Sequence, residues 1–154
     1  MDENTIIHKL LDVFEYKNAY QHQTSNIQPQ DMYVLERIYF HGKVIVKDLS
    51  KQYSIPPSTL TGIIDRLEKK KLIERLRTNI DRRAIELVAT AKGKDVVDKH
   101  IIEDKLFSKN LFNTLETQKK EILKELLNEL LTNVKKESLF SSDTELRSDS
   151  NGDN

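Results

Sequence analysis

Apolar residues recur three and four positions apart in several stretches of the chain, which is the spacing of one face of an α-helix. A first helix is predicted over about residues 5–23, from the apolar positions Ile6, Ile7, Leu10, Leu11 and Phe14. A second is predicted to begin at Pro29 and Asp31 and to end near Gly42. Its apolar face consists of Met32, Leu35, Ile38 and Tyr39.

The middle of the chain predicts two short helices joined by a turn. The first carries Leu49 and Tyr53, four residues apart, and the second carries one apolar stripe of Leu60, Ile63, Ile64 and Leu67. Pro57 fits the first turn of the second helix, where the N–H that proline lacks would have no intrahelical partner. Two helices joined in this way form a helix-turn-helix motif.

Two six-residue runs, LIERLR and AIELVA, follow directly and alternate apolar with charged residues. They predict an antiparallel hairpin with TNIDRR at its tip. A helix-turn-helix followed by such a hairpin is a winged helix. The pattern therefore predicts a mainly α fold with a small β-wing.

The last part of the chain predicts two further helices and a tail. Thr90 is a suitable N-cap for a helix from Ala91 to about Asn113. The final helix has a broad apolar stripe, formed by Ile122, Leu123, Leu126, Leu127, Leu130, Leu131 and Val134. Residues 138–154 are rich in Ser, Asp and Asn, and predict a disordered acidic tail.

Composition mainly excludes function classes. The chain has 154 residues and no cysteine, which excludes disulfides and thiolate chemistry. Its N-terminus has acidic residues before the apolar positions and no long uncharged run, so neither a signal peptide nor a membrane span is expected. We therefore expect a cytoplasmic protein without a membrane partner.

The charges cancel over the whole chain but are unevenly distributed. Residues 57–94 contain ten Lys or Arg and five acids, whereas residues 137–154 contain five acids and one Arg. The basic surplus coincides with the second helix of the helix-turn-helix and the hairpin. It indicates an anionic partner for this part of the chain.

The predicted winged helix has side chains suited to double-stranded DNA. The major groove admits an α-helix, and the apolar stripe directs the following side chains outward: Ser58, Thr59, Thr61, Gly62, Asp65, Arg66 and Lys69. Hydroxyls are short hydrogen-bonding groups for phosphates and bases, and Gly62 adds no bulk. The candidate DNA-contacting residues, including those of the hairpin, are Ser58, Thr59, Thr61, Gly62, Arg66, Lys69, Arg77, Asp81, Arg82 and Arg83.

The hairpin tip suits the narrow, electronegative minor groove, which attracts arginine. Asp81 lies two residues before Arg83 and could pair with it, which would orient that guanidinium and leave Arg82 for the phosphate backbone. The alternative is a solvated loop whose charges keep the hairpin soluble.

The runs STLTGIIDRLEKKKLIER and DRRAIELVATAKGK together resemble the MarR family of bacterial winged-helix transcription regulators. The resemblance is close over about residues 31–93. It implies about six helices with a two- or three-stranded wing, a recognition helix over residues 57–71, and a minor-groove contact supported by Asp81 and Arg83. It further implies a repressor that a small-molecule effector releases from DNA.

The resemblance also implies a homodimer with intertwined first and last helices, acting on a roughly palindromic operator. One domain is then expected over residues 1–137, with a winged-helix part at 31–90 and helical dimerisation parts at 1–30 and 91–137. The expected dimerisation residues are Ile7, Leu10, Leu11, Phe14, Ile122, Leu123, Leu126, Leu127, Leu130, Leu131 and Val134.

The chain departs from the family pattern at two positions. Lys71 stands where a glycine usually follows the recognition helix, so the turn there must be made without glycine. Pro56 stands where Ser or Thr is common, and it supplies no capping side chain.

The resemblance leaves the effector open, as a small aromatic or anionic compound. Tyr16, Tyr20, Tyr33, Tyr39 and Phe40 could line its pocket, but we expect them to pack the core between the first two helices. His41, His100 and Asp104 could converge as metal ligands. Because lone histidines on helices are more often packed or surface residues, we expect no metal site and no cofactor.

The sequence also bears on two other function classes, enzymes and protein-binding modules. The chain has no glycine-rich phosphate loop, nucleophile elbow or paired metal-ligand motif, so we expect no enzymatic activity. A winged helix can also serve protein contacts alone. The basic surplus and the arginine-tipped wing favour DNA over that alternative.

Overall fold

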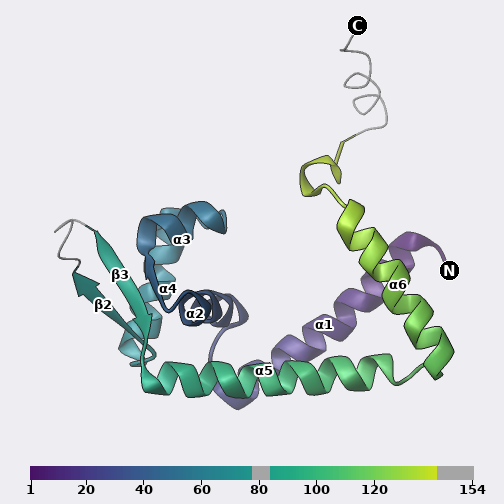
Figure 1. Cartoon of the computed structure of the whole chain (residues 1–154), viewed down its shortest axis with the longest axis horizontal. Helices are drawn as coiled ribbons and strands as arrows, with labels where there is room; N and C mark the ends of the chain where they lie inside the picture. The colour runs from purple at the N-terminus through teal and green to yellow at the C-terminus, as the bar shows by residue number, and fades with distance from the viewer. Residues whose placement is uncertain (78–83, 142–154) are drawn as a thin grey trace, which may run out of the picture. The chain divides into compact units, whose positions relative to one another are not determined.

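The computed structural model of the chain describes residues 1–77 and 84–141. Its elements are, in chain order, α1 (Glu3–Ser25), α2 (Pro29–His41), β1 (Lys43–Ile45), α3 (Val46–Gln52), α4 (Pro57–Lys69), β2 (Ile73–Arg77), β3 (Ile85–Ala89), α5 (Ala91–Phe112), α6 (Thr117–Asn133) and the short 3-10 helix η1 (Lys136–Ser138) (Figure 1). The predicted mainly α winged-helix fold is confirmed. The chain divides into two compact units, residues 1–108 and 109–154.

The wing sheet of the first unit has three strands in the order β1-β3-β2, with both pairings antiparallel. Leu87 on the central strand lies opposite Val44 of β1 and Arg75 of β2. Leu87 and Val44 are buried, so one face of the sheet packs on the core. The short extended run before α3 thus supplies the third strand.

The core of the first unit lies between α2, α3, α4, the sheet and the start of α5. Its completely or almost completely buried apolar side chains include Leu35, Ile38, Leu49, Leu60, Ile63, Leu67, Leu72, Ile73, Leu87 and Val97. The apolar faces predicted for α2 and α4 are the faces that the structure buries. Periodicity alone was sufficient here because both helices bury a single stripe against the core.

The expectation that the aromatic residues pack the core is confirmed for Tyr39, which packs against it, and is wrong for the other four. Tyr16, Tyr20, Tyr33 and Phe40 are exposed. The guanidinium carbon of Arg37 lies 4.4 Å from the centre of the Tyr33 ring. Tyr39 is half-buried and donates a hydrogen bond of 2.6 Å to Asp98, which raises the pKa of the tyrosine. The core side of α2 is occupied mainly by its aliphatic residues, and the four other aromatic side chains are exposed.

The turn after α4 is closed by two backbone hydrogen bonds around Lys71. The Lys71 N–H donates to the Glu68 carbonyl at 2.8 Å, and the Leu72 N–H donates to the Leu67 carbonyl at 3.0 Å. This is the Schellman arrangement, in which the residue after the C-cap takes the left-handed conformation. Lys71 has φ of 59°, so it occupies a glycine position without being glycine.

We expect Lys71→Gly to raise the free energy of unfolding by about 0.5–1 kcal/mol, because glycine adopts this conformation without the steric cost of a β-carbon. Urea denaturation at fixed protein concentration measures the change. Lys71→Ala removes the same charge but keeps the β-carbon, so it should give no comparable gain. Equal stabilisation by both substitutions would show that the lysine charge, not the backbone, is responsible.

Apolar side chains remain uncovered on helices of both units. On α1 the predicted positions Ile7, Leu10, Leu11 and Phe14 are exposed. No residue of α6 is buried, and the exposed members of its apolar stripe are Ile122, Leu126, Leu130, Leu131 and Val134. Leu123 and Leu127 are half-buried. Within residues 1–77 and 84–141, no helix has the length and apolar character needed to cross a membrane.

The predicted tail is only partly described. Ser138, its first residue, ends the η1 turn that begins at Lys136. Residues 142–154 lie outside the described part of the chain, so the predicted disorder of the tail stays a prediction.

Candidate nucleic-acid interface

One face of α4 packs into the core and the opposite face carries the predicted contact residues. Ser58, Thr61 and Lys69 are exposed, and Thr59 and Gly62 are half-buried. The Thr61 hydroxyl donates to the Pro57 carbonyl at 2.9 Å, which leaves its oxygen free to accept. The face is therefore polar, uncharged and low in relief near the start of the helix.

Gly62 lies in the middle of this face. A β-carbon at this position would lie 3.4 Å from Nη1 of Arg66, and it would meet no other neighbour within 4 Å. The helix therefore has room for a larger residue as far as the protein itself is concerned. What the glycine provides is close access to the backbone of α4 from outside.

The start of α4 has free backbone donors. Pro56 is its N-cap and makes no side-chain hydrogen bond to the helix, as predicted for a proline at this position. The first intrahelical bond runs from the Leu60 N–H to the Pro56 carbonyl at 2.9 Å. The N–H groups of Ser58 and Thr59 therefore point outward from the helix end without an intrahelical acceptor, an arrangement that suits an anion.

Arg66 is held by a buried acid that sequence reasoning did not connect with it. Its guanidinium donates two parallel hydrogen bonds to Asp31, of 2.8 and 2.7 Å. The side chain of Asp31 is only 3% exposed, whereas that of Arg66 is 52% exposed. The hydrogen bond to Asp31 and the attraction between the charges raise the pKa of Arg66. The pair therefore fixes α4 against the first turn of α2.

This pairing changes the interpretation of Arg66 as a DNA contact. Two donors of its guanidinium are already engaged with Asp31, and a bidentate pair of this kind is directional. The side chain remains exposed, so a further contact through its remaining donors stays a prediction. No local spacing signals the pair, because its partners are 35 positions apart in the chain.

Arg75 pairs with the two acids on the outer side of α4. From strand β2 its Nε donates to Glu68 at 2.8 Å, and its Nη2 pairs with Asp65. Carboxylates facing DNA would repel the phosphate backbone, and the single positive charge of Arg75 offsets one of these two negative charges. Lys69 and Arg77 are exposed and form no ion pair within the described ranges.

The predicted DNA contacts at the tip of the wing fall in a part of the chain that the structure does not describe. Asp81, Arg82 and Arg83 lie outside the described residues, so the proposed pairing of Asp81 with Arg83 stays a prediction. The strands that carry this tip are in register from Ile73 opposite Ala89 to Arg77 opposite Ile85. Arg77, the last described residue before the tip, is exposed.

Thr90 joins the end of α4, the wing and the start of α5. Its hydroxyl donates to the Lys71 carbonyl at 2.8 Å and accepts the Gly93 N–H at 3.0 Å, which confirms its role as the N-cap of α5. Its own N–H donates to the Leu72 carbonyl at 3.0 Å. A β-carbon on Gly93 would overlap the Leu72 carbonyl oxygen and lie 3.0 Å from the carbonyl carbon. Gly93 is therefore needed for this close approach, a role that no sequence signal indicated.

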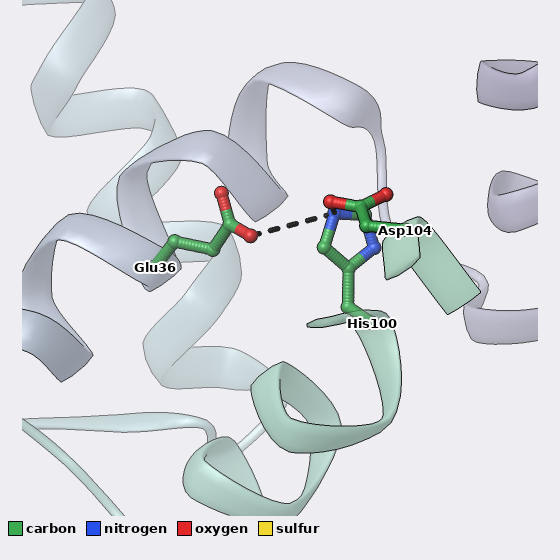
Figure 2. Close-up of side chains that lie close together, drawn as sticks. All are labelled: Glu36, His100 and Asp104. Carbon is green, nitrogen blue, oxygen red and sulfur yellow. Dashed lines mark ion pairs between the residues drawn. The ribbon is translucent and has the colours of Figure 1, made fainter. Parts of the chain in front are cut away.

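A second cluster of polar side chains lies away from α4, where α2 faces α5. Glu36 comes from α2, and His100 and Asp104 lie one turn apart on α5 (Figure 2). His41, which was considered as a partner of His100 and Asp104, does not belong to this cluster: its Nε2 shares a hydrogen bond of 2.8 Å with the Tyr53 hydroxyl. His41 and Glu36 are five residues apart on α2, which places them about 140° apart around the helix. The residue of α2 that faces His100 and Asp104 is therefore Glu36 and not His41.

Lys17 and Gln21 of α1 border the same cluster. Lys17 Nζ lies 2.6 Å from Oδ1 of Asp104, and the Gln21 amide donates to that oxygen at 2.9 Å. Burial alone would raise the pKa of Asp104, but these hydrogen bonds outweigh it and hold the pKa below its ordinary value. Burial raises the pKa of Glu36, and attraction to His100 offsets only part of this effect.

Comparison with known proteins identifies the family. A model of the MarR family matches residues 27–85. The HTH-type transcriptional regulator FarR of Neisseria gonorrhoeae is 31% identical over 106 residues, which cover 69% of this chain and 73% of FarR. The chain belongs to the MarR family.

Other MarR-like relatives match a smaller share of their length. The uncharacterised HTH-type transcriptional regulator YwhA of Bacillus subtilis is 29% identical over 89 residues, 58% of this chain and 64% of YwhA. The HTH-type transcriptional repressor MdtR of the same organism is 34% identical over 71 residues, 46% of each protein. The chain thus spans about half to two thirds of these two relatives.

Solved structures support the MarR fold independently of sequence. A mutant of MepR from S. aureus has a TM-score of 0.79 at 19% identity, covering 88% of this chain and 100% of MepR. FabT of Streptococcus pneumoniae, solved in complex with DNA, has a TM-score of 0.73 at 22% identity, covering 85% and 96%. At these identities the likeness concerns the fold alone.

Proposed function

We propose that this MarR-family protein is a transcriptional regulator that binds double-stranded DNA sequence-specifically through α4 and the wing. The observation that carries the proposal is the outer face of α4. It presents hydroxyls and a glycine, and its acids Asp65 and Glu68 both pair with Arg75, which offsets one of their two negative charges. The crystallised complex of FabT with DNA supports the same use of this fold.

In this proposal α4 lies in the major groove, and its N-terminal half makes the closest contacts to DNA. The free N–H groups of Ser58 and Thr59 bind a backbone phosphate, and the Thr61 hydroxyl reaches a base edge or a second phosphate. Gly62 allows the helix backbone to come close to the groove floor. Lys69, Arg77 and the arginines of the wing tip add contacts to phosphates and to the minor groove.

We further propose that the protein acts as a homodimer on a pseudo-palindromic operator. Support comes from the apolar side chains left uncovered on α1 and α6, which a second copy of the chain would bury. The name of MdtR as a repressor supports repression as the sign of regulation. Release by a small aromatic or anionic effector remains an expectation of the family resemblance.

Fluorescence anisotropy with the DNA upstream of the gene tests the proposal. Binding should be sequence-selective and should weaken by roughly a thousandfold or more between about 50 and 200 mM salt, because about six or more phosphate contacts release counterions. Gly62→Ala should stabilise the fold by about 1 kcal/mol, since alanine is the better helix former. The same variant should bind DNA at least tenfold more weakly, because the added methyl group lies on the groove-facing side.

The two readouts of Gly62→Ala make the variant its own control, since weaker binding cannot be ascribed to loss of folding. Unchanged affinity would mean that α4 does not approach DNA closely. If the folded dimer binds no upstream fragment selectively, the alternative function applies, a winged helix used for protein contacts.

A further inference from the structure

The Glu36, His100 and Asp104 side chains converge on one point between α2 and α5 (Figure 2). One potential ligand atom from each residue lies within 4.8 Å of the other two. The imidazole and Glu36 are largely buried, with 13% and 16% of their side-chain surfaces exposed. Groups that are so confined and so close to one another keep their arrangement in the absence of a ligand.

The distances fit ligands around a shared ion better than groups bonded to one another. Nε2 of His100 lies 3.5 Å from Oε1 of Glu36 and 3.5 Å from Oδ2 of Asp104, beyond the usual range of an N–H to oxygen hydrogen bond. Two atoms that each bind a zinc ion at about 2.1 Å with a tetrahedral angle lie about 3.4 Å apart. The observed spacing therefore leaves room for an ion between the three groups.

The hydrogen bonding of His100 also points to an additional partner. Its Nδ1 is buried without a hydrogen-bond partner, and none of the described residues forms a hydrogen bond with its Nε2. Buried polar atoms are rarely left in this state. A cation bound at Nε2 would satisfy that nitrogen, and a water molecule from the adjoining cavity is one available partner for the other.

The charges around the cluster favour a cation over an anion. Two carboxylates face a single ammonium, that of Lys17, which contacts only Oδ1 of Asp104. Oδ2 of Asp104 and Oε1 of Glu36 face the imidazole instead. The buried Glu36 has no full counter-charge in contact, so a bound cation would offset its desolvation.

The adjoining cavity has room for water molecules that would complete the coordination of an ion. It has a volume of about 180 Å³ and is lined by residues that include Lys17, Gln21, His22, Tyr33 and the three cluster residues. Water occupies about 30 Å³ per molecule in the liquid, so the space is sufficient for an ion with its water ligands. Imidazole together with carboxylates suits zinc, manganese, iron, cobalt and nickel better than calcium or copper(I).

We propose that Glu36, His100 and Asp104 bind one divalent transition-metal ion per protomer, with water completing the coordination. The ion joins α2, which leads into the helix-turn-helix, to α5, which leads away from it. Metal binding thereby restrains the position of one helix against the other. This site differs from the sequence-based expectation of no metal, which considered His41 in place of Glu36.

Isothermal titration calorimetry of the full, untagged chain with zinc chloride tests the site, together with the visible absorption of the cobalt(II) form. Wild-type protein should bind one ion per protomer. His100→Ala should weaken binding by at least about 100-fold because it removes a direct ligand, and Glu36→Gln by at least about tenfold because it replaces a charged ligand with a neutral one. Lys17→Met should strengthen binding, because it removes the ammonium that competes for Asp104.

His41→Ala is the matched control, because it removes a histidine of α2 that lies outside the cluster. It should leave the affinity and the cobalt spectrum unchanged. Glu36→Gln preserves shape, so it keeps the test valid if His100→Ala folds poorly by circular dichroism. Wild-type protein without site-specific zinc binding, or zinc affinity that Glu36→Gln leaves unchanged, overturns the proposal. Both results are independent of whether the protein binds DNA.

Discussion

Gly93→Ala should destabilise the protein by roughly 3 kcal/mol, which corresponds to a fall of about 10 °C in the melting temperature. The added methyl group cannot be accommodated by a side-chain rotation, since it meets the backbone carbonyl of Leu72. Relief of this overlap requires α5 to move away from the Leu72 segment, which would stretch the two hydrogen bonds from Thr90. Urea and thermal denaturation, followed by circular dichroism, measure the loss.

Gly62→Ala is the matched control for this substitution, since it makes the same chemical change on another helix where there is room for the methyl group. The two variants should therefore shift stability in opposite directions. A loss of less than about 1 kcal/mol in Gly93→Ala would contradict the close packing of α5 on Leu72, because helix propensity alone favours alanine.

The double substitution Leu126→Glu with Leu130→Glu should abolish the proposed dimer. The two leucines lie one turn apart on the exposed apolar stripe of α6, and burial of a leucine side chain contributes about 1.5–3 kcal/mol. A carboxylate in the same position would have to be desolvated or would keep the surfaces apart. The dimer dissociation constant should rise by at least about a thousandfold, as measured by sedimentation velocity.

Asn128→Glu is the control, because it adds one carboxylate to the same helix outside the apolar stripe. This variant should remain as dimeric as the wild type and should keep its affinity for DNA. If the double variant is folded and still dimeric, the stripe of α6 does not form the dimer interface. The exposed face of α1 would then be the next surface to substitute.

Most of the secondary structure could be predicted because each element carries its own local signal. The stripe Leu60, Ile63, Ile64 and Leu67 fixed both the extent and the buried face of α4, and Thr90 marked the start of α5. Alternation of apolar and charged residues located β2 and β3 within one residue. The third strand, β1, was only suggested, because three residues carry too little pattern to separate a strand from a turn.

The contacts that organise the candidate sites could not be predicted in the same way. Asp31 appeared as an ordinary acid near a helix start, and nothing in its neighbourhood indicates that it is buried against Arg66. Gly93 gave no signal in the sequence, although the close approach of Leu72 makes it necessary. Glu36 was missed as a neighbour of His100 because the faces of α2 and α5 that meet depend on tertiary packing. Each contact joins positions far apart in the chain.

The hydrogen bonds of Thr90 have a mechanical consequence. They tie the end of α4 and the beginning of β2 to the first turn of α5, so that these three elements turn together as one body. In the proposed dimer, the winged helix of each protomer would therefore move together with its own α5. A change in the tilt of α5 would then change the separation of the two winged helices without changing the shape of either. A ligand that changes that tilt would alter how well the spacing of the two winged helices matches the helical repeat of DNA. It would do so without contacting any residue that binds DNA.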